Sequence, residues 1–235
     1  MSLVYKIISN DLKLVFRDKS LVVMFIIPVA VTMLCRFGVP QIEAVFPSIK
    51  EYYWLIVASL TSLSASTPSF LMGFLLLDEK DENVDTLIRI LPLPTNFILK
   101  SRVLLIVGFG MIFSLFILLL NNLVRLTFPY LFLLSFLFAL IPPALTFAIT
   151  AFAKNKIQAA TMYKGLSIAL FLPMVAFFFP GNLKFLLGVI PFFWTFNAFH
   201  LVGHPFLFGL NFGVSIVMHL LYIALFYQLY KKKAG

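Results

Sequence analysis

Long apolar stretches, each close to the length that a helix needs to cross a lipid bilayer, dominate this sequence. A hydrocarbon core about 30 Å thick takes about 20 helical residues. Of the 235 residues, 62% are hydrophobic and 11% are charged, whereas soluble domains carry about 25% charged residues. The candidate spans are residues 21–39, 52–77, 103–120, 130–152, 165–180 and 212–230. We therefore expect an all-α integral membrane protein with six transmembrane helices, forming a single domain over residues 1–235.

The positions of the basic residues indicate how such a chain lies in its membrane. With the N-terminus in the cytoplasm, all but four of the 18 Lys and Arg residues fall on the inner side. The four outer ones are Arg36, Lys50, Arg125 and Lys184. This asymmetry follows the positive-inside rule and predicts a multi-pass protein of a bacterial cytoplasmic membrane with both termini inside. Topology thus explains the net charge of +9, and binding to nucleic acid is not expected.

Residues 1–20 precede the first span and have the pattern of a helix lying on the membrane surface. At 100° per residue, residues 4–19 place apolar side chains on one side and polar ones on the other, which predicts an amphipathic interfacial helix. Its polar side carries Lys13 and Arg17. Asp11 falls towards the apolar side and weakens the pattern, although a neighbouring protein could accept it there. A plain membrane anchor is the alternative role for this helix.

The second span is unusually rich in hydroxyl groups. Its small polar residues are Ser59, Thr61, Ser62, Ser64, Ser66, Thr67 and Ser69. Small hydroxylated residues let membrane helices approach closely and bond to one another, so close helix packing is the favoured interpretation. The alternative is that Ser59, Ser62 and Ser66 line a translocation path.

The aromatic segment 181–209 is too broken to form a straight span. Gly188, Pro191, Gly203 and Pro205 interrupt it. We expect two short re-entrant or interfacial helices on the outer side before the last span, with Trp194 at headgroup depth.

The segment 78–94, between the second and third spans, holds five of the nine acidic residues and lies on the predicted cytoplasmic side. Asn83 is a good N-cap and Pro92 stops a helix, so a short helix is expected between them. Its apolar residues follow the helical spacing i, i+3, i+4, i+7: Val84, Leu87, Ile88 and Leu91. Isolated helices this short are marginal in water, so the apolar face predicts a partner surface.

This segment resembles the first cytoplasmic loop of the ABC-2-type permeases. That loop typically has an acidic lead-in, Gly-Thr, Leu-rich turns, a Pro-containing end and a Lys; Asn83 and Val84 stand here in place of Gly-Thr. The matching residues are Glu79 and Glu82 for the lead-in, Leu87 and Ile88 for the turns, Pro92 for the end and Lys100 for the Lys that opens the third span. The order of elements is also similar, from an interfacial helix ending at Arg17 through six spans to a broken outer segment near Pro191.

The resemblance implies the membrane permease of an ATP-binding cassette exporter. Such a permease pairs with a second copy or a paralogue in the lipid bilayer and exports an amphiphilic or hydrophobic drug, peptide or lipid. Segment 78–94 would dock as a coupling helix on a separate ATP-binding subunit, which holds the ATP and magnesium, so no cofactor is expected in this chain. The implied ATPase-coupling residues are Glu79, Glu82, Asn83, Val84, Leu87, Ile88, Leu91 and Pro92.

Two patterns in the sequence are compatible with an enzyme or a metal site instead. Asp78, Asp81 and Asp85 have the spacing with which membrane prenyltransferases hold magnesium and a diphosphate, but no acidic residue follows Asp85 to form a second cluster. His200 and His204 are four apart without a third ligand nearby, and the chain has a single cysteine. We therefore expect no catalytic and no metal site.

The source of energy distinguishes the remaining functional classes. The sequence has no G-x-x-x-x-G-K-[ST] phosphate loop, so a transport subunit driven by another protein is expected, not an enzyme. A channel or an ion-gradient-driven transporter is the alternative. Such proteins normally carry ionisable residues within their spans, and we expect almost none here away from the span ends.

Overall fold

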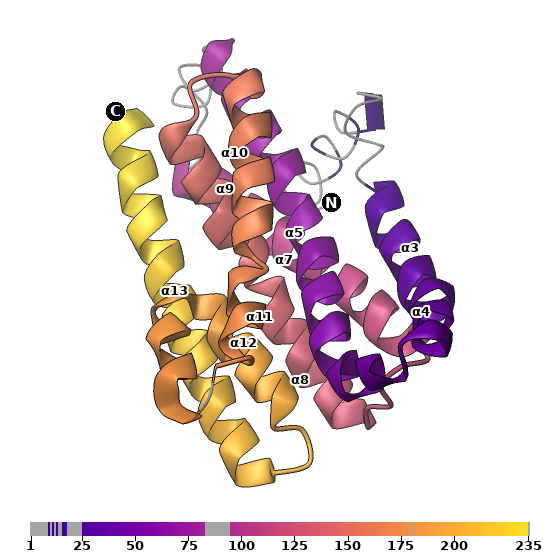
Figure 1. Ribbon diagram of the computed structural model, residues 1–235. Coiled ribbons are helices and arrows are strands. Elements are labelled where there is room, and N and C mark those ends of the chain that lie inside the picture. Colours follow the sequence, from indigo (N-terminus) through magenta and orange to yellow (C-terminus); the bar gives the residue numbers. More distant parts are fainter. Residues whose placement is uncertain are drawn as a thin grey trace.

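The computed structural model describes residues 25–82, 95–179 and 181–234, together with Ser9, Asp11, Lys13, Phe16 and Arg17. The described chain is helical and contains no strand (Figure 1). Its α-helices are α3 (Ile26–Met33), α4 (Val39–Val45), α5 (Tyr53–Asp81), α7 (Thr95–Leu120), α8 (Phe128–Ala139), α9 (Ile141–Phe152), α10 (Lys156–Ala169), α11 (Leu172–Ala176), α12 (Pro191–His200) and α13 (Pro205–Ala234). A π-helix, η2 (Leu34–Gly38), and the 3-10 helices η3 (Pro47–Tyr52) and η4 (Gly181–Val189) complete the described elements.

Six helical segments are long and apolar enough to cross a membrane, which confirms the predicted fold class. They are Ile26–Val45, Pro47–Asp81, Phe97–Leu120, Phe128–Phe152, Lys156–Ala176 and Pro205–Lys232.

The structure shifts the edges of several predicted spans. The first continues to Val45 instead of ending at residue 39, because α4 follows the π-helix η2 without a break and carries Pro40 in its first turn, where proline is tolerated. The fifth begins at Lys156, because the side chain of Asn155 accepts a hydrogen bond of 2.9 Å from the backbone N–H of Gln158 and caps the helix. The sixth begins at Pro205, a residue suited to a first helical turn.

The outer segment before the last span is therefore shorter than residues 181–209. It contains η4 and α12, the two short helices that the sequence predicts, followed by a turn in which Gly203 has a φ of +99°. Only glycine adopts this conformation without strain. The last residues of the predicted segment belong to α13.

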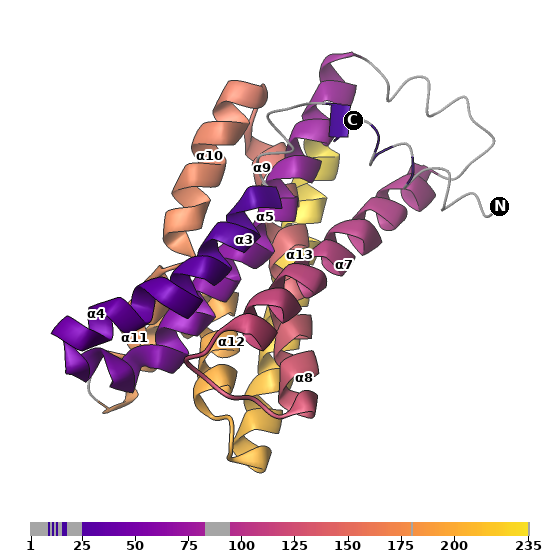
Figure 2. The ribbon, with the colours of Figure 1, turned by 90° about the vertical axis from the view of Figure 1, so that its right-hand side faces the viewer.

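Two spans form the centre of the bundle and four surround them. In Pro47–Asp81 and in Phe128–Phe152, 83% of the most apolar window is buried inside the chain, against 22% to 28% in the other four spans. The long helix α5 packs on α7, α9 and α10, and the central position of α5 is visible in Figures 1 and 2. The small hydroxylated residues of α5 suit this position because they let its neighbours approach.

The proline inside α5 shows how these hydroxyl groups support the buried backbone. Pro68 has no N–H, so the carbonyl of Ser64 loses its usual helical partner. The hydroxyl of Thr67 donates to that carbonyl at 2.9 Å. A central helix can therefore contain proline without leaving a backbone carbonyl unpaired in the membrane.

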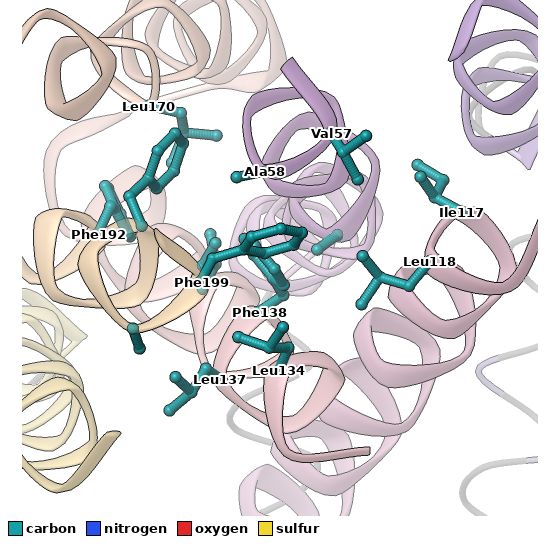
Figure 3. Close-up of a cluster of buried hydrophobic side chains, with 14 of the residues drawn as sticks. Val57, Ala58, Ile117, Leu118, Leu134, Leu137, Phe138, Leu170, Phe192 and Phe199 are labelled. Atoms are coloured by element: carbon teal, nitrogen blue, oxygen red, sulfur yellow. The ribbon is translucent and has the colours of Figure 1, made fainter. Parts of the chain in front are cut away.

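A large apolar core fills one half of the bundle (Figure 3). Phe138 of α8 and Phe199 of α12 lie at its centre, with leucines and isoleucines from α7 and α8 around them. We call the end of the bundle where Asp11, the last turn of α5 and the first turns of α7 and α10 meet the Arg102 end.

Candidate functional site

Arg102 near the start of α7 joins three segments of the chain through a buried ionic cluster. Its Nε and Nη2 atoms donate to the two carboxylate oxygens of Asp11 at 3.1 Å and 3.2 Å. Its Nη1 donates to Oε2 of Glu79 on α5 at 2.6 Å, and Nη2 also donates to Oε1 of Glu79. The guanidinium thus binds two carboxylates at once, each bidentately, which its planar fork of donors allows. We call Asp11, Glu79 and Arg102 the ionic node.

The three side chains of the ionic node are largely buried, so the loss of any one of them leaves a buried charge without its partner. Only 6%, 4% and 13% of the side chains of Arg102, Asp11 and Glu79 are exposed. Removing one partner of a buried ion pair typically costs about 3–5 kcal/mol, because the charge left behind is neither paired nor hydrated. The node therefore fixes α5, α7 and the segment around Asp11 relative to one another.

The node identifies a partner for Asp11 that differs from the prediction. Asp11 does face the interior, but its partner is Arg102 of the same chain and not a neighbouring protein. Among the described residues of the predicted interfacial helix, Asp11 is buried, and Lys13, Phe16 and Arg17 are exposed. Phe16 stacks on Phe25 with ring centroids 5.4 Å apart, next to the first span.

A second ion pair holds the last turn of α5 from another side. Nζ of Lys156 at the start of α10 lies 2.8 Å from Oδ1 of Asp78. The pair is partly exposed, so it contributes at most about 1 kcal/mol. Asp78 and Glu79 are adjacent on the helix and point about 100° apart, so together they attach α5 to α10 and to α7. Asp81 and Glu82, which follow, are exposed.

The predicted coupling residues are only partly within the described chain. Glu79 belongs to the ionic node and Glu82 is exposed at the end of α5. The other six predicted residues lie outside the described residues: Asn83, Val84, Leu87, Ile88, Leu91 and Pro92. The structure describes the helices on either side of the segment: α5 leads into it and α7 leads out of it (Figure 2).

The three serines of the alternative translocation path are all buried. Ser62 donates to the carbonyl of Ala58 at 3.0 Å, and Ser66 donates to the carbonyl of Leu63 at 2.7 Å and lies 3.2 Å from the hydroxyl of Tyr163. Ser59 has no hydrogen-bond partner among the described residues. The contact between Ser66 and Tyr163 joins α5 to α10, whereas the other two hydrogen bonds lie within α5. A role in the path stays a prediction.

The described residues contain no group of acidic, histidine or cysteine side chains that could hold a metal ion. Asp78 is paired with Lys156 and Asp85 lies outside the described residues. The ring of His200 packs on Trp54 with centroids 4.4 Å apart. Partial burial, then the nearby Lys184 and His204, lower the pKa of His200, so its ring is neutral at pH 7.

Two residues stand out in the structure that sequence reasoning did not single out. Arg102 was counted only among the inner basic residues, and its neighbours in the node lie 91 and 23 positions away. His219 lies near the middle of the span Pro205–Lys232 and is completely buried. His219 is therefore an exception to the expectation that the spans carry almost no ionisable residues away from their ends, whereas Arg102 lies near the start of its span. The sequence signal for His219 was its place within a long apolar run.

Comparison with known protein families gives one match that extends over most of the chain. Residues 11–227 match the family described as "Fluoroquinolones export permease protein Rv2686c-like". Comparison with individual curated proteins gives no match. The matched region runs from Asp11 of the ionic node into the last span and includes all six membrane-crossing segments. The chain therefore belongs to the Rv2686c-like family, an ABC-2-type family of export permeases.

Proposed function

We propose that this permease is the membrane subunit of an ATP-binding cassette exporter and that a separate ATPase drives it by docking on segment 78–94. Two copies of the chain, or this chain and a paralogue, would form the membrane part, with both termini in the cytoplasm. The cargo we propose is an amphiphilic or hydrophobic drug, of which the fluoroquinolones in the family's description are the first candidates. ATP and magnesium would be bound by the partner subunit.

The observation that carries this proposal is the ionic node, which joins the two helices that flank the proposed docking segment. Glu79 lies four residues before the start of the predicted helix at Asn83, and Arg102 lies eleven residues after its end at Leu91. A displacement of segment 78–94 would therefore move α5 and α7 together instead of bending one away from the other. Packed helices transmit such shifts as rigid bodies. Because α5 lies at the centre of the bundle, its movement reaches α9 and α10 as well.

The docking proposal is tested by placing charge on the predicted apolar face. Changing Leu87→Asp together with Leu91→Asp is expected to abolish co-purification of the permease with its ATPase, because two desolvated carboxylates cannot enter an apolar groove. Pull-down from detergent-solubilised membranes measures this. Val45→Asp is the control: Val45 is 70% exposed and lies just before η3, which leads into the first turn of α5, whereas the docking segment follows the last turn of α5. The docking site would be refuted by a doubly substituted permease that is folded and still retains the ATPase.

An ion-gradient-driven transporter is the second candidate, and His219 is the observation that favours it. A buried ionisable residue in the middle of a span is typical of proton relays in pumps and transporters. In sealed vesicles, an exporter of the proposed class moves cargo when ATP is supplied and the ion gradients are collapsed. Export that requires a gradient and ignores ATP would favour the second candidate.

A further inference from the structure

A row of polar side chains crosses the interface between α12 and α13 within the membrane-spanning region. Asn211, Ser215 and His219 are spaced by four residues and so share one face of α13. Thr195 and Asn197 of α12 face them. All five side chains are buried, with at most 5% exposure. We call these five residues the polar seam.

Hydrogen bonds across the polar seam fix the orientation of its groups. Nδ2 of Asn211 donates to the carbonyl of Leu207 at 2.8 Å, so its Oδ1 is the atom that faces α12. That oxygen accepts a hydrogen bond of 2.7 Å from Nδ2 of Asn197. The hydroxyls of Thr195 and Ser215 lie 2.9 Å apart.

The geometry around His219 defines its protonation. Its Nδ1 lies 2.8 Å from the carbonyl oxygen of Ser215, which can only accept, so Nδ1 carries the hydrogen. In the neutral ring Nε2 is then an acceptor. The ring of Phe192 lies beside it, with centroids 5.7 Å apart.

Two atoms of the polar seam lack a hydrogen-bond partner among the described residues, and both are acceptors. They are Nε2 of His219 and Oδ1 of Asn197. A buried polar atom left unpaired costs about 1–3 kcal/mol, a cost that few groups in a membrane interior carry without a functional reason. The two levels of the seam, at Asn211 and at His219, are separated by eight residues, or about 12 Å along α13.

The polar contacts of the seam are individually weak, although α12 and α13 also pack closely through apolar side chains. Two hydrogen bonds between neutral side chains join α12 to α13, and such bonds average about 0.6 kcal/mol each in membrane proteins. Helix α12 has ten residues and is followed by a turn at Gly203 with positive φ. Movement of this short helix would expose the acceptors without unfolding a membrane-crossing helix.

We propose that the polar seam parts during transport and binds a cargo with a flat aromatic body and an amine, whose N–H bonds to Nε2 of His219. This acceptor requires a ligand that donates a hydrogen bond, since a ligand carrying only acceptors would oppose like atoms. The aromatic ring of Phe192 lies beside His219 and suits the flat apolar body of such a molecule. This proposal rests on the proposed function and identifies where in the permease the cargo is recognised.

The acceptor at His219 is tested with a matched pair of substitutions. The amide of glutamine reaches the position of Nε2, whereas that of asparagine reaches only the position of Nδ1. We expect His219→Gln to bind norfloxacin, a fluoroquinolone with a secondary-amine N–H, within about twofold of wild type, and His219→Asn to bind it about tenfold more weakly. Equilibrium dialysis of the full permease–ATPase complex in nanodiscs measures the affinity.

Either of two results would overturn the assignment of the acceptor: equal affinity of wild type and His219→Asn, or no saturable binding of norfloxacin to wild type. Co-purification of the ATPase is recorded on the same samples. It judges the proposed function separately, because substitution at His219 leaves the Arg102 end untouched. A folded His219→Asn complex that retains its ATPase and loses the drug supports both proposals.

The opening of the seam has its own test. Thr195→Cys with Ser215→Cys, in a Cys35→Ala background, places two thiols where the hydroxyls lie 2.9 Å apart, a spacing from which a disulfide can form. Oxidation is expected to reduce norfloxacin export at least tenfold, and reduction with dithiothreitol is expected to restore it. A seam that stays closed throughout transport would give full export with the disulfide confirmed by mass spectrometry.

Discussion

Replacing Arg102 with glutamine is expected to destabilise the permease by about 3–5 kcal/mol and to abolish export, because the change leaves the carboxylates of Asp11 and Glu79 buried without a cation. The thermal midpoint of the detergent-solubilised protein measures the first effect. ATP-dependent uptake of a fluoroquinolone into inverted vesicles measures the second. A substitution that left both values unchanged would show that the ionic node has no role in stability or coupling.

Two control variants separate charge burial from coupling. Lys156→Gln breaks the partly exposed pair with Asp78 and is expected to cost less than about 1 kcal/mol. The triple change Asp11→Asn, Glu79→Gln and Arg102→Gln removes all three buried charges, so most of the lost stability should return. Export by the triple variant is expected to stay low, because neutral amides bind more weakly than the charged groups that join α5 to α7. Full export by that variant would restrict the node to a folding role.

Replacing Gly110 with valine is expected to cost about 3 kcal/mol and to reduce the yield of folded protein strongly. A Cβ at this position would lie 3.0 Å from Cγ of Pro142 and 3.2 Å from the backbone Cα of Ala139. The carbonyl oxygen of Ala65 on α5 lies 3.6 Å away. Backbone atoms from neighbouring helices cannot move aside as a side chain can, so the added methyl groups overpack the junction of α5, α7 and α9.

Gly108 on the same helix supplies the matched control. A Cβ added there meets no atom within 4 Å. Both positions lie inside α7 and carry the same change in helix propensity, so the difference between Gly110→Val and Gly108→Val reports packing alone. Fluorescence-detected gel filtration after heating measures both variants. Equal midpoints would show that the close approach at Gly110 is absent in the membrane.

The spans were predictable from the sequence because hydropathy reports directly which residues lie in lipid. Their ends were less predictable, since hydropathy does not report how far a helix continues beyond the apolar core. Helix α5 runs on to Asp81, where ion pairs hold its last turn, and the fifth span begins early because Asn155 caps it. In both cases polar side chains, not the length of the apolar run, determine the position of the helix terminus.

The candidate site was predictable only in part. The acidic residues near Glu79 drew attention to the right region through their local pattern, but the partners of Glu79 depend on contacts between distant parts of the chain. A helical-wheel projection placed Asp11 correctly on the inward side and could not identify Arg102 as its partner. The polar seam likewise depends on α12 folding back against α13, which brings Asn197 to Asn211. Periodicity within one helix contains no information about such pairings.

The most direct test of ATP-driven export is reconstitution of the permease with its ATPase in sealed liposomes without an ion gradient. We expect fluoroquinolone transport that requires ATP, that stops when Leu87 and Leu91 are both changed to aspartate, and that continues in the Val45→Asp control. Transport at the wild-type rate by the Leu87 and Leu91 variant, or by the permease without the ATPase, would contradict the proposed mechanism.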